Sequence, residues 1–328
     1  MGEPSTDWAE KVGADEAGRF AGYGKIIAAM QRNRSAKYGT GRALHRKGTL
    51  AARASFEVMP DLPAFARHGL FATPGRHDAR VRLSNGGPDL KANAKPDIRG
   101  FAIKVLGVSG PSSLGGDTDH QDFLTINQDS FASPTSVEFM GAVEALGRGG
   151  EPALIWHLFR TYGIGGGFAR LKTLMSVLQR PFSGYATETF DTVLPIACGP
   201  CAARLRLVPA SGAPSCPKGT DIVDHLRGLL AAGDLRWDVR LRFFVDEKTT
   251  PIEDATVAWP ADAPETTVAR LTLPRQTFDD AAAQDFAAMI DKARFDPWGG
   301  LEAHRPLGEI MRARKAAYLA SQQGRDAT

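Results

Sequence analysis

The sequence predicts an α+β protein in which an antiparallel sheet or barrel carries added helices. Strand-like segments cluster in two parts of the chain and do not alternate regularly with helices, as they would in a doubly wound sheet. In Trp237–Phe243 apolar and polar residues alternate with period two, a pattern typical of an antiparallel strand with one buried face. No internal repeat or long linker is visible. We therefore expect a helical arm, residues 1–35, followed by a single domain, residues 36–328.

The elements follow from local patterns. Ser5, Thr6 and Asp7 offer helix N-caps ahead of a partly helical apolar pattern that reaches Met30, so the arm is expected to be one helix. Short segments rich in β-forming residues, separated by turn residues, predict strands. The expected strands are Leu50–Met59, Ala79–Leu83, Gly100–Leu106, Phe123–Ile126, Trp237–Phe243 and Thr267–Leu273. Helices are expected over about 137–180, broken at Gly147–Gly150 and Gly163–Gly167, and over about 279–295 and 307–325.

Composition excludes several classes of protein. The 328 residues are 43% apolar and 23% charged, which excludes disordered and fibrous chains. A net charge of +3 is too small to indicate a nucleic-acid binder. No apolar run approaches 18 residues and no signal peptide is evident, so we expect no membrane span and a cytoplasmic protein. Three cysteines cannot build a disulfide framework.

The most conspicuous short motif is Cys198-Gly199-Pro200-Cys201. A redox dithiol of this kind usually begins a helix, whose N-terminus lowers the pKa of the thiol. Here both flanks are strand-like, so the motif is interpreted as a structural turn. A zinc site that included Cys216 would lack a fourth ligand of suitable spacing. The glycine-rich segment Gly163–Gly167 is likewise interpreted as a joint between helices rather than a phosphate loop.

The last expected helix carries a more informative pattern. Arg314, Tyr318 and Arg325 share one helix face. A cation one turn before a phenol favours the ionised phenolate, and a tyrosinate is one of the known axial ligands of haem iron. Arg325 could reach a carboxylate such as a haem propionate. On this segment alone, a solvated helix with a half-buried tyrosine remains the simpler interpretation.

Five motifs, in order along the chain, support the interpretation of Tyr318 as a haem ligand. They are Arg42-Ala43-Leu44-His45-Arg46-Lys47-Gly48, Val81-Arg82-Leu83-Ser84, Asp97-Ile98-Arg99-Gly100-Phe101-Ala102-Ile103-Lys104, Asp122 with Asn127 five residues later, and Arg314 with Tyr318 and Arg325. In this set the sequence resembles the haem catalase superfamily, in particular its small catalase-related peroxidase branch. Leu83 stands where the family has Phe. The resemblance extends over nearly the whole chain after the first helix.

The resemblance implies a catalase-like antiparallel β-barrel with surrounding helices and a haem b buried between the barrel and the C-terminal helix. Tyr318 matches the proximal tyrosinate that ligates the iron, with Arg314 holding it ionised. His45 matches the distal acid–base histidine, with Ser84 as its partner, and Asn127 matches the distal asparagine. The arginines that match the family's propionate ligands are Arg42, Arg82 and Arg325. Phe139 is a looser match to a phenylalanine on the haem face.

The implied activity is a haem peroxidase or catalase-like oxidoreductase. Its partners are hydrogen peroxide or an organic hydroperoxide and a small-molecule electron donor, which the sequence does not name. The chain lacks the family's long arms and C-terminal additions, so we expect a wider pocket, low catalase activity and a smaller assembly such as a homodimer. Ala320 replaces an aspartate of the family's proximal segment, which leaves the local contacts there open.

Two alternatives remain open. The nearer one also resembles a branch of this superfamily, the allene oxide synthases, which rearrange fatty-acid hydroperoxides. They carry a threonine just before the distal histidine, and Leu44 at this place favours peroxide turnover instead. The second alternative is a haem carrier or sensor without turnover. A carrier needs no distal acid–base group, so His45 with Asn127 disfavours it.

Overall fold

Eight antiparallel strands close into a barrel in the computed structural model, which describes residues 3–327. The short strand β5 closes it by pairing with both β4 and β7. The barrel strands are β1 (Gly48–Val58), β2 (Gly75–Asn85), β3 (Arg99–Pro111), β4 (Asp117–Ile126), β5 (Phe190–Asp191), β7 (Cys201–Pro209), β8 (Leu235–Phe243) and β9 (Glu265–Leu273). A ninth strand, β6 (Ile196–Cys198), adds to β7. The predicted α+β class with an antiparallel barrel is confirmed.

The barrel is held by the residues that alternate inward along each strand. In β8, Leu235, Trp237, Val239, Leu241 and Phe243 are buried and every residue between them keeps accessible surface, as the period-two pattern predicts. Their partners across the interior include Phe101 and Phe190, whose rings lie against one another at a centroid distance of 5.3 Å. Burial of each large apolar side chain contributes roughly 1.5–3 kcal/mol, so this continuous core fixes the barrel as a rigid support.

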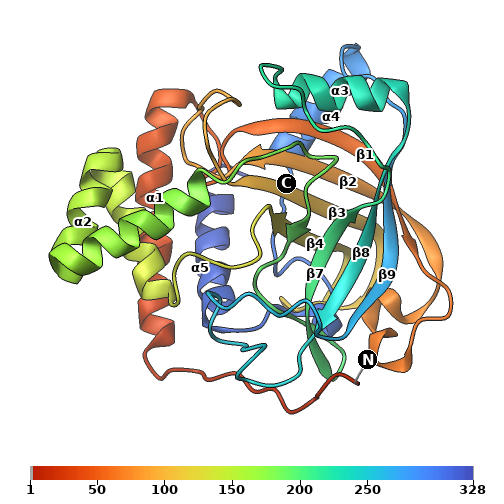
Figure 1. Cartoon of the computed structure of the whole chain (residues 1–328), viewed down its shortest axis with the longest axis horizontal. Coiled ribbons are helices and arrows are strands. Elements are labelled where there is room, and N and C mark those ends of the chain that lie inside the picture. Colours follow the sequence, from red (N-terminus) through yellow and green to blue (C-terminus); the bar gives the residue numbers. More distant parts are fainter. Residues whose placement is uncertain (1–2, 328) are drawn as a thin grey trace.

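Three helices stand together on one side of the barrel, as Figure 1 shows: α1 (Glu16–Tyr38), α2 (Ser136–Leu178) and α5 (Glu309–Gln323). The helices α3 (Ile222–Ala232) and α4 (Ala281–Lys292) lie over another part of it, at the top of that view. Single-turn 3₁₀ segments occur at Ala64–Ala66, Gly69–Ala72 and Glu302–His304. Within residues 3–327 we find no helix with the length and apolarity needed to span a bilayer.

The N-terminal segment differs from the predicted helix. The helix begins at Glu16 and ends at Tyr38, and the segment before it is extended. The Ser5 N–H donates to the carbonyl of Phe244 at 3.0 Å, and the Trp8 indole N–H donates to the carbonyl of Pro200 at 2.8 Å. The cap-forming residues of this segment therefore pair with distant parts of the chain, an outcome that local propensity does not encode.

Arg312 of α5 ties the N-terminal segment to that helix. Its guanidinium contacts the carboxylates of Glu10 at 2.6 Å, Glu16 at 2.8 Å and Glu253 at 3.4 Å. All four side chains are at least four-fifths buried, so the network is little screened by solvent. The segment, the start of α1 and α5 are thereby held together.

The predicted breaks in the long helix are confirmed, with one refinement. Gly149, Gly150 and Gly163 have non-helical backbone angles, and Gly150 and Gly163 have φ of 68° and 69°. The glycines from 165 to 167 remain helical, so the second break is a single residue. The break is a kink between helical segments and not a phosphate loop.

The Cys198–Cys201 motif is a tight turn between β6 and β7, as predicted. Gly199 has φ of 58°, and a Cβ there would lie 2.3 Å from the His68 ring, so only glycine fits. Burial raises the pKa of the Cys198 thiol to about 12, the opposite of what an attacking thiolate requires. Both thiols are free and buried, and a redox role has no support in their surroundings.

Candidate functional site

His45 lies between α1 and β1, at the end of the barrel where β2 ends and β3 begins. Its backbone has φ of 48°, a conformation that is rare for a residue with a side chain and is common at functional sites. The His45 N–H donates to the carbonyl of Gly86 at 3.0 Å, and its Nδ1 lies 3.0 Å from the Ser84 hydroxyl. These two contacts fix the direction of the ring. Its Nε2 has no hydrogen-bond partner among residues 3–327.

Gly100 makes room for this pair. A Cβ on residue 100 would lie 2.7 Å from both His45 Nδ1 and Ser84 Oγ, closer than any real Cβ contact. Gly100 pairs directly with Ser84 in the β2–β3 ladder, so strand register alone places the glycine beneath the imidazole. The observed position of the His45 ring therefore requires a glycine at residue 100.

His45 is neutral at ordinary pH. Burial lowers the pKa of the imidazole to about 3, and the nearby charges of Arg82, Arg314 and Arg42 lower it further. A neutral imidazole whose Nδ1 is held by Ser84 has Nε2 free to accept a proton. Helix α5 lies beside this segment, because the Ala43 N–H donates to the Ser321 hydroxyl at 3.3 Å.

Asn127 follows β4 directly and is buried. Its side-chain oxygen accepts a 2.7 Å hydrogen bond from the Arg99 N–H, and its own N–H donates to the Arg99 carbonyl at 3.1 Å. Because Arg99 precedes Gly100, the asparagine and the histidine are fixed by consecutive residues of one strand. The Asn127 amide nitrogen has no acceptor within the described chain and is free to donate to a ligand.

On α5, Arg314 and Tyr318 form the pair that their spacing predicts. The Arg314 guanidinium donates to the Tyr318 hydroxyl at 3.0 Å, and its Cζ lies 5.3 Å from the centre of the phenol ring. The phenol is half-buried. A hydroxyl oxygen that accepts from a guanidinium is oriented and electron-rich, as an oxygen ligand of a metal must be.

Arg42, Arg82 and Arg325 converge on the end of α4. Arg42 donates to the Asp291 carbonyl at 2.6 Å, and Arg82 contacts the Asp291 carboxylate at 3.0 Å. Arg325 donates to the carbonyls of Lys292 at 2.7 Å and Ala293 at 3.0 Å. Residues that lie far apart in the sequence thus form one arginine cluster, which adjoins His45 because Arg82 also donates to the His45 carbonyl at 3.1 Å.

The arginine cluster carries more positive charge than its surroundings balance. One carboxylate, that of Asp291, contacts Arg42 and Arg82, whereas Arg325 reaches only backbone carbonyls at the negative end of the α4 dipole. Burial and mutual repulsion lower the pKa of Arg42 to about 8 and that of Arg325 to about 10. Buried like charges with so few counterions are costly, and a bound anion with two carboxylates would relieve the cost.

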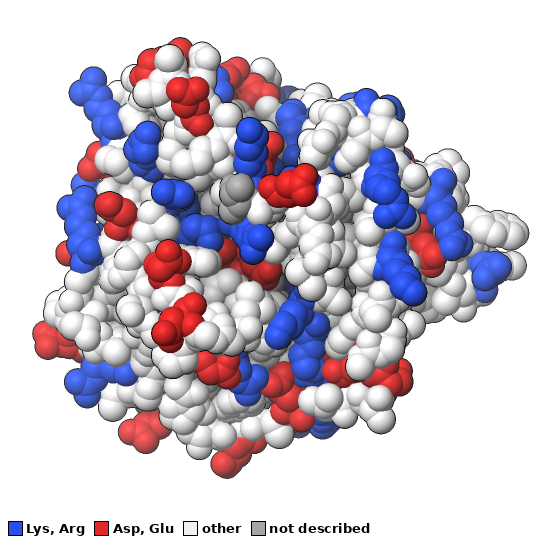
Figure 2. Space-filling view, turned by 180° about the vertical axis from the view of Figure 1, so that it is seen from behind, with Lys and Arg blue, Asp and Glu red and all other residues white. Residues whose placement is uncertain are grey.

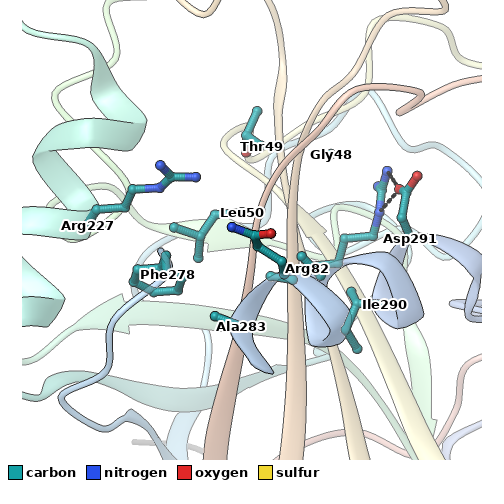
Figure 3. A pocket seen from close by; sticks show the side chains of 12 residues that line it. Gly48, Thr49, Leu50, Arg82, Arg227, Phe278, Ala283, Ile290 and Asp291 are labelled. Carbon is teal, nitrogen blue, oxygen red and sulfur yellow. Dashed lines mark hydrogen bonds and ion pairs between the residues drawn. The ribbon is translucent and has the colours of Figure 1, made fainter. Parts of the chain in front are cut away.

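A cavity of about 310 Å³ opens beside the arginine cluster. Figure 3 shows Arg82 and its partner Asp291 on one side of this cavity and Arg227 and Phe278 on the other. Leu50, from β1, and Ile290, from α4, are among its apolar lining residues. Arg82 is the residue of the arginine cluster that lines this cavity.

Phe139 lies near the first turn of α2 and contacts Phe131, at a ring-centroid distance of 4.9 Å. It packs with Leu44, the residue before His45, and with Ala317, the residue before Tyr318, in a shared apolar cluster. Phe139 therefore lies near both halves of the candidate site, between the barrel end and α5.

The structure brings together the site residues that the sequence indicates. His45, Ser84 and Asn127 surround the beginning of β3. Arg314 and Tyr318 lie on α5, which contacts the segment of His45 through the Ala43–Ser321 hydrogen bond, and the arginine cluster adjoins His45 through Arg82. Three contributors carry no role in the sequence interpretation: Gly100, Arg99 and Asp291. Gly100 and Arg99 lie inside the motif from Asp97 to Lys104, and strand pairing explains their roles. No sequence signal marks Asp291, because its partners come from three distant segments.

Protein side chains alone do not form a metal site here: within the described residues, no group of three or more His, Cys, Asp or Glu side chains could hold an ion. A metal at Tyr318 would therefore have to bring most of its own ligands, as the iron of a porphyrin does.

Comparisons with known proteins give a likeness of fold. No family model matches the chain, and no curated protein matches it by sequence. Among solved structures, a fungal catalase superposes with a TM-score of 0.66 at 17% identity, covering 88% of this chain and 59% of that one. Catalase A from Saccharomyces cerevisiae gives 0.66 at 15%, covering 88% and 61%. A bacterial catalase gives 0.62 at 15%, covering 88% and 57%.

The chain thus spans about three-fifths of the length of these catalases. Together with the barrel topology, these superpositions establish that the chain has a catalase-like fold.

Proposed function

We propose that this protein is a haem-dependent peroxidase that reduces hydrogen peroxide or organic hydroperoxides at the expense of a small-molecule donor. The observation that carries the proposal is the arrangement around the start of β3. A half-buried neutral histidine has a free Nε2, a phenol on the neighbouring helix α5 is hydrogen-bonded to a guanidinium, and an undercompensated arginine cluster adjoins the histidine.

The residues present fit haem b. Its two propionates are the kind of dianion that the arginine cluster lacks, and the buried Nε of Arg325 has no acceptor within the described residues. Tyr318 would supply the single protein ligand that a porphyrin iron needs, and the Arg314 guanidinium orients its hydroxyl. Arg42, Arg82 and Arg325 would hold the propionates, and Phe139 would lie against the ring.

Haem, when bound, supplies the iron at which the peroxide O–O bond breaks and the oxidising equivalents are kept until a donor reduces them. His45 Nε2 takes the proton of the bound peroxide and returns it to the departing oxygen, acting first as base and then as acid. Ser84 keeps Nδ1 oriented during this exchange. The Asn127 amide donates to the peroxide and fixes its orientation.

The test is an absorption spectrum of the purified protein after reconstitution with haem. We expect a Soret band with high-spin ferric tyrosinate features in the wild type and their loss in Tyr318→Phe. Tyr162→Phe is the matched control, because Tyr162 also lies near a cation, with the Arg170 guanidinium carbon 5.2 Å from its ring centre, but is remote in the sequence from every proposed ligand. A wild-type spectrum that Tyr318→Phe leaves unchanged would contradict the proposal.

A second assay separates peroxidase activity from rearrangement. Leu44, which precedes His45, favours peroxide turnover over fatty-acid hydroperoxide rearrangement. We therefore expect stoichiometric oxidation of a phenolic donor with each equivalent of hydroperoxide. Disappearance of a fatty-acid hydroperoxide without any consumption of donor would show the rearranging activity instead.

A further inference from the structure

The later part of α2, residues 151–178, projects away from the barrel and is here called the α2 arm. Figure 1 shows its outermost part on the far side of α1 from the barrel, and its last turns cross α1 back toward the barrel. The first segment of α2 is anchored, since Met140 and Val143 pack against Phe20 and Ile27 of α1. Beyond the kink at Gly149–Gly150, the buried residues of the arm are Leu158 and Gly167. The α2 arm therefore contributes little to the core.

Large apolar side chains cover the α2 arm. The exposed ones are Ile155 (41%), Trp156 (70%), Ile164 (76%), Phe168 (61%) and Met175 (39%). The last three have spacings of four and seven residues and share one helix face. The Phe168 ring packs edge-on against Phe159 at a centroid distance of 4.8 Å, and Ile155 and Trp156 lie one turn before Phe159. The apolar surface thus continues across the kink at Gly163.

The charges of this segment have a single sign. No Asp or Glu occurs from residue 152 to residue 187, whereas Arg160, Arg170, Lys172 and Arg180 do. Arg170 pairs with Glu138 at 3.0 Å, but Arg160 and Lys172 have no ion-pair partner within the described chain. In Figure 2 the projection at the right edge is largely white at its tip, with blue side chains beside it.

Three kinds of partner can be weighed against this surface. A second copy would bring the unbalanced cations of two arms together, which like-charge repulsion disfavours. A purely acidic partner would leave Trp156 and Phe168 without apolar contact. An anionic lipid surface satisfies both features, because its headgroups attract Lys and Arg while its acyl boundary accepts Trp, Phe and Ile.

We propose that the α2 arm docks the protein onto the surface of an anionic lipid bilayer. The side chains of Trp156, Ile164 and Phe168 enter the boundary between headgroups and acyl chains. Arg160 and Lys172 contact the phosphate groups of the lipids. The arm lies in the interface, consistent with the finding that no described helix is built to cross a bilayer. Docking requires neither haem nor turnover, so it can fail or succeed independently of the proposed peroxidase activity.

The test is co-sedimentation of the full chain with vesicles of phosphatidylglycerol or of phosphatidylcholine, at low and high salt. We expect binding to the anionic vesicles, weakened by salt. Phe168→Ser and Trp156→Ser should each weaken it about tenfold, by loss of buried apolar area. Lys172→Glu should weaken it about tenfold or more, through loss and reversal of one charge near the surface. All three residues are outside the core, so the variants are expected to fold.

Matched controls lie elsewhere on the surface. Leu114→Ser removes an equally exposed apolar side chain from the β3–β4 turn, and Lys218→Glu reverses an exposed charge remote in the sequence from the arm. Both should bind as the wild type does. Equal binding to phosphatidylcholine, or wild-type binding by the Phe168→Ser and Trp156→Ser variants, would overturn the proposal. So would a dimer in solution that Phe168→Ser converts to a monomer, because a second copy would then be the partner.

Discussion

Two regions of the molecule each hold a histidine, buried in one and half-buried in the other, and they use it differently. His304, in the 3₁₀ turn Glu302–His304, accepts a 3.0 Å hydrogen bond from the Leu70 N–H through Nε2 and donates through Nδ1 to the Ala197 carbonyl at 3.2 Å. His45 is held through Nδ1 alone, by Ser84. Burial lowers the pKa of both, to about 4 and about 3. A depressed pKa therefore does not distinguish the two histidines, whereas the Nε2 of His45, which has no partner among the described residues, does.

The largest expected effect is that of His45→Ala on turnover. Loss of the acid–base group should lower kcat/KM for peroxide by about 10³-fold, within the 10²–10⁴ that such groups contribute. Steady-state assays of the haem-loaded enzyme would measure it, with haem content and melting temperature as checks that the fold and cofactor remain. Turnover within a factor of two of wild type would leave the two histidines without a functional difference.

His304→Ala should do the reverse. It removes a fully enclosed ring that touches Phe71 and leaves the Leu70 N–H and the Ala197 carbonyl unpaired. The cavity and the lost hydrogen bonds should together cost about 3 kcal/mol of unfolding free energy. Urea unfolding would measure this loss, and activity per bound haem should stay near that of the wild type at low temperature. An equal loss of activity per haem would remove the contrast with His45.

Gly100→Ala tests how strongly activity depends on the position of the His45 ring. The added Cβ would displace the His45 ring and the Ser84 hydroxyl without removing either, because it would lie 2.7 Å from both. A displacement near 1 Å at a reacting group can cost about a hundredfold. We therefore expect kcat to fall by roughly 10- to 100-fold although the His45 and Ser84 side chains are both present. Gly75→Ala, at the start of β2, is the control, since nothing lies within 4 Å of its Cβ. If the two variants behave alike, the strand register does not position the ring.

The smallest effect is a pH dependence of stability. The folded-state pKa of His45, about 3, lies below its ordinary value near 6.5, so the unfolded chain binds the extra proton first. The stability that His45 contributes is therefore complete above pH 6.5 and declines as the pH falls toward 3. Urea unfolding between pH 7 and pH 4.5 should show a shallower decline in His45→Gln than in the wild type.

The wild-type curve alone does not isolate this effect. Buried carboxyls such as Asp191, whose pKa burial raises to about 6, act in the opposite direction as the pH falls. The difference between the two proteins cancels that contribution. Parallel curves would mean that His45 is as easily protonated in the folded chain as in the unfolded one.

The sequence predicts well what local pattern determines. The alternation in Trp237–Phe243 marks β8, and the Arg314–Tyr318 spacing predicts a contact that one helical turn enforces. Contacts among distant segments are not encoded in this way. The segment around Ser5 carries helix-capping residues but is held extended by partners near residues 200 and 244, and Asp291 gains its role from three arginines on separate elements.

The Arg312 network also bears on how this protein can be shortened. Residues Glu10 and Glu16 reach α5 only two positions before Arg314, so the start of the chain fastens the helix that presents Tyr318. Trimming the first fifteen residues would remove Glu10 and leave the buried guanidinium with two of its three carboxylates. Truncation at the N-terminus would therefore weaken the attachment of α5, the helix that carries the proposed axial ligand near the other end of the sequence.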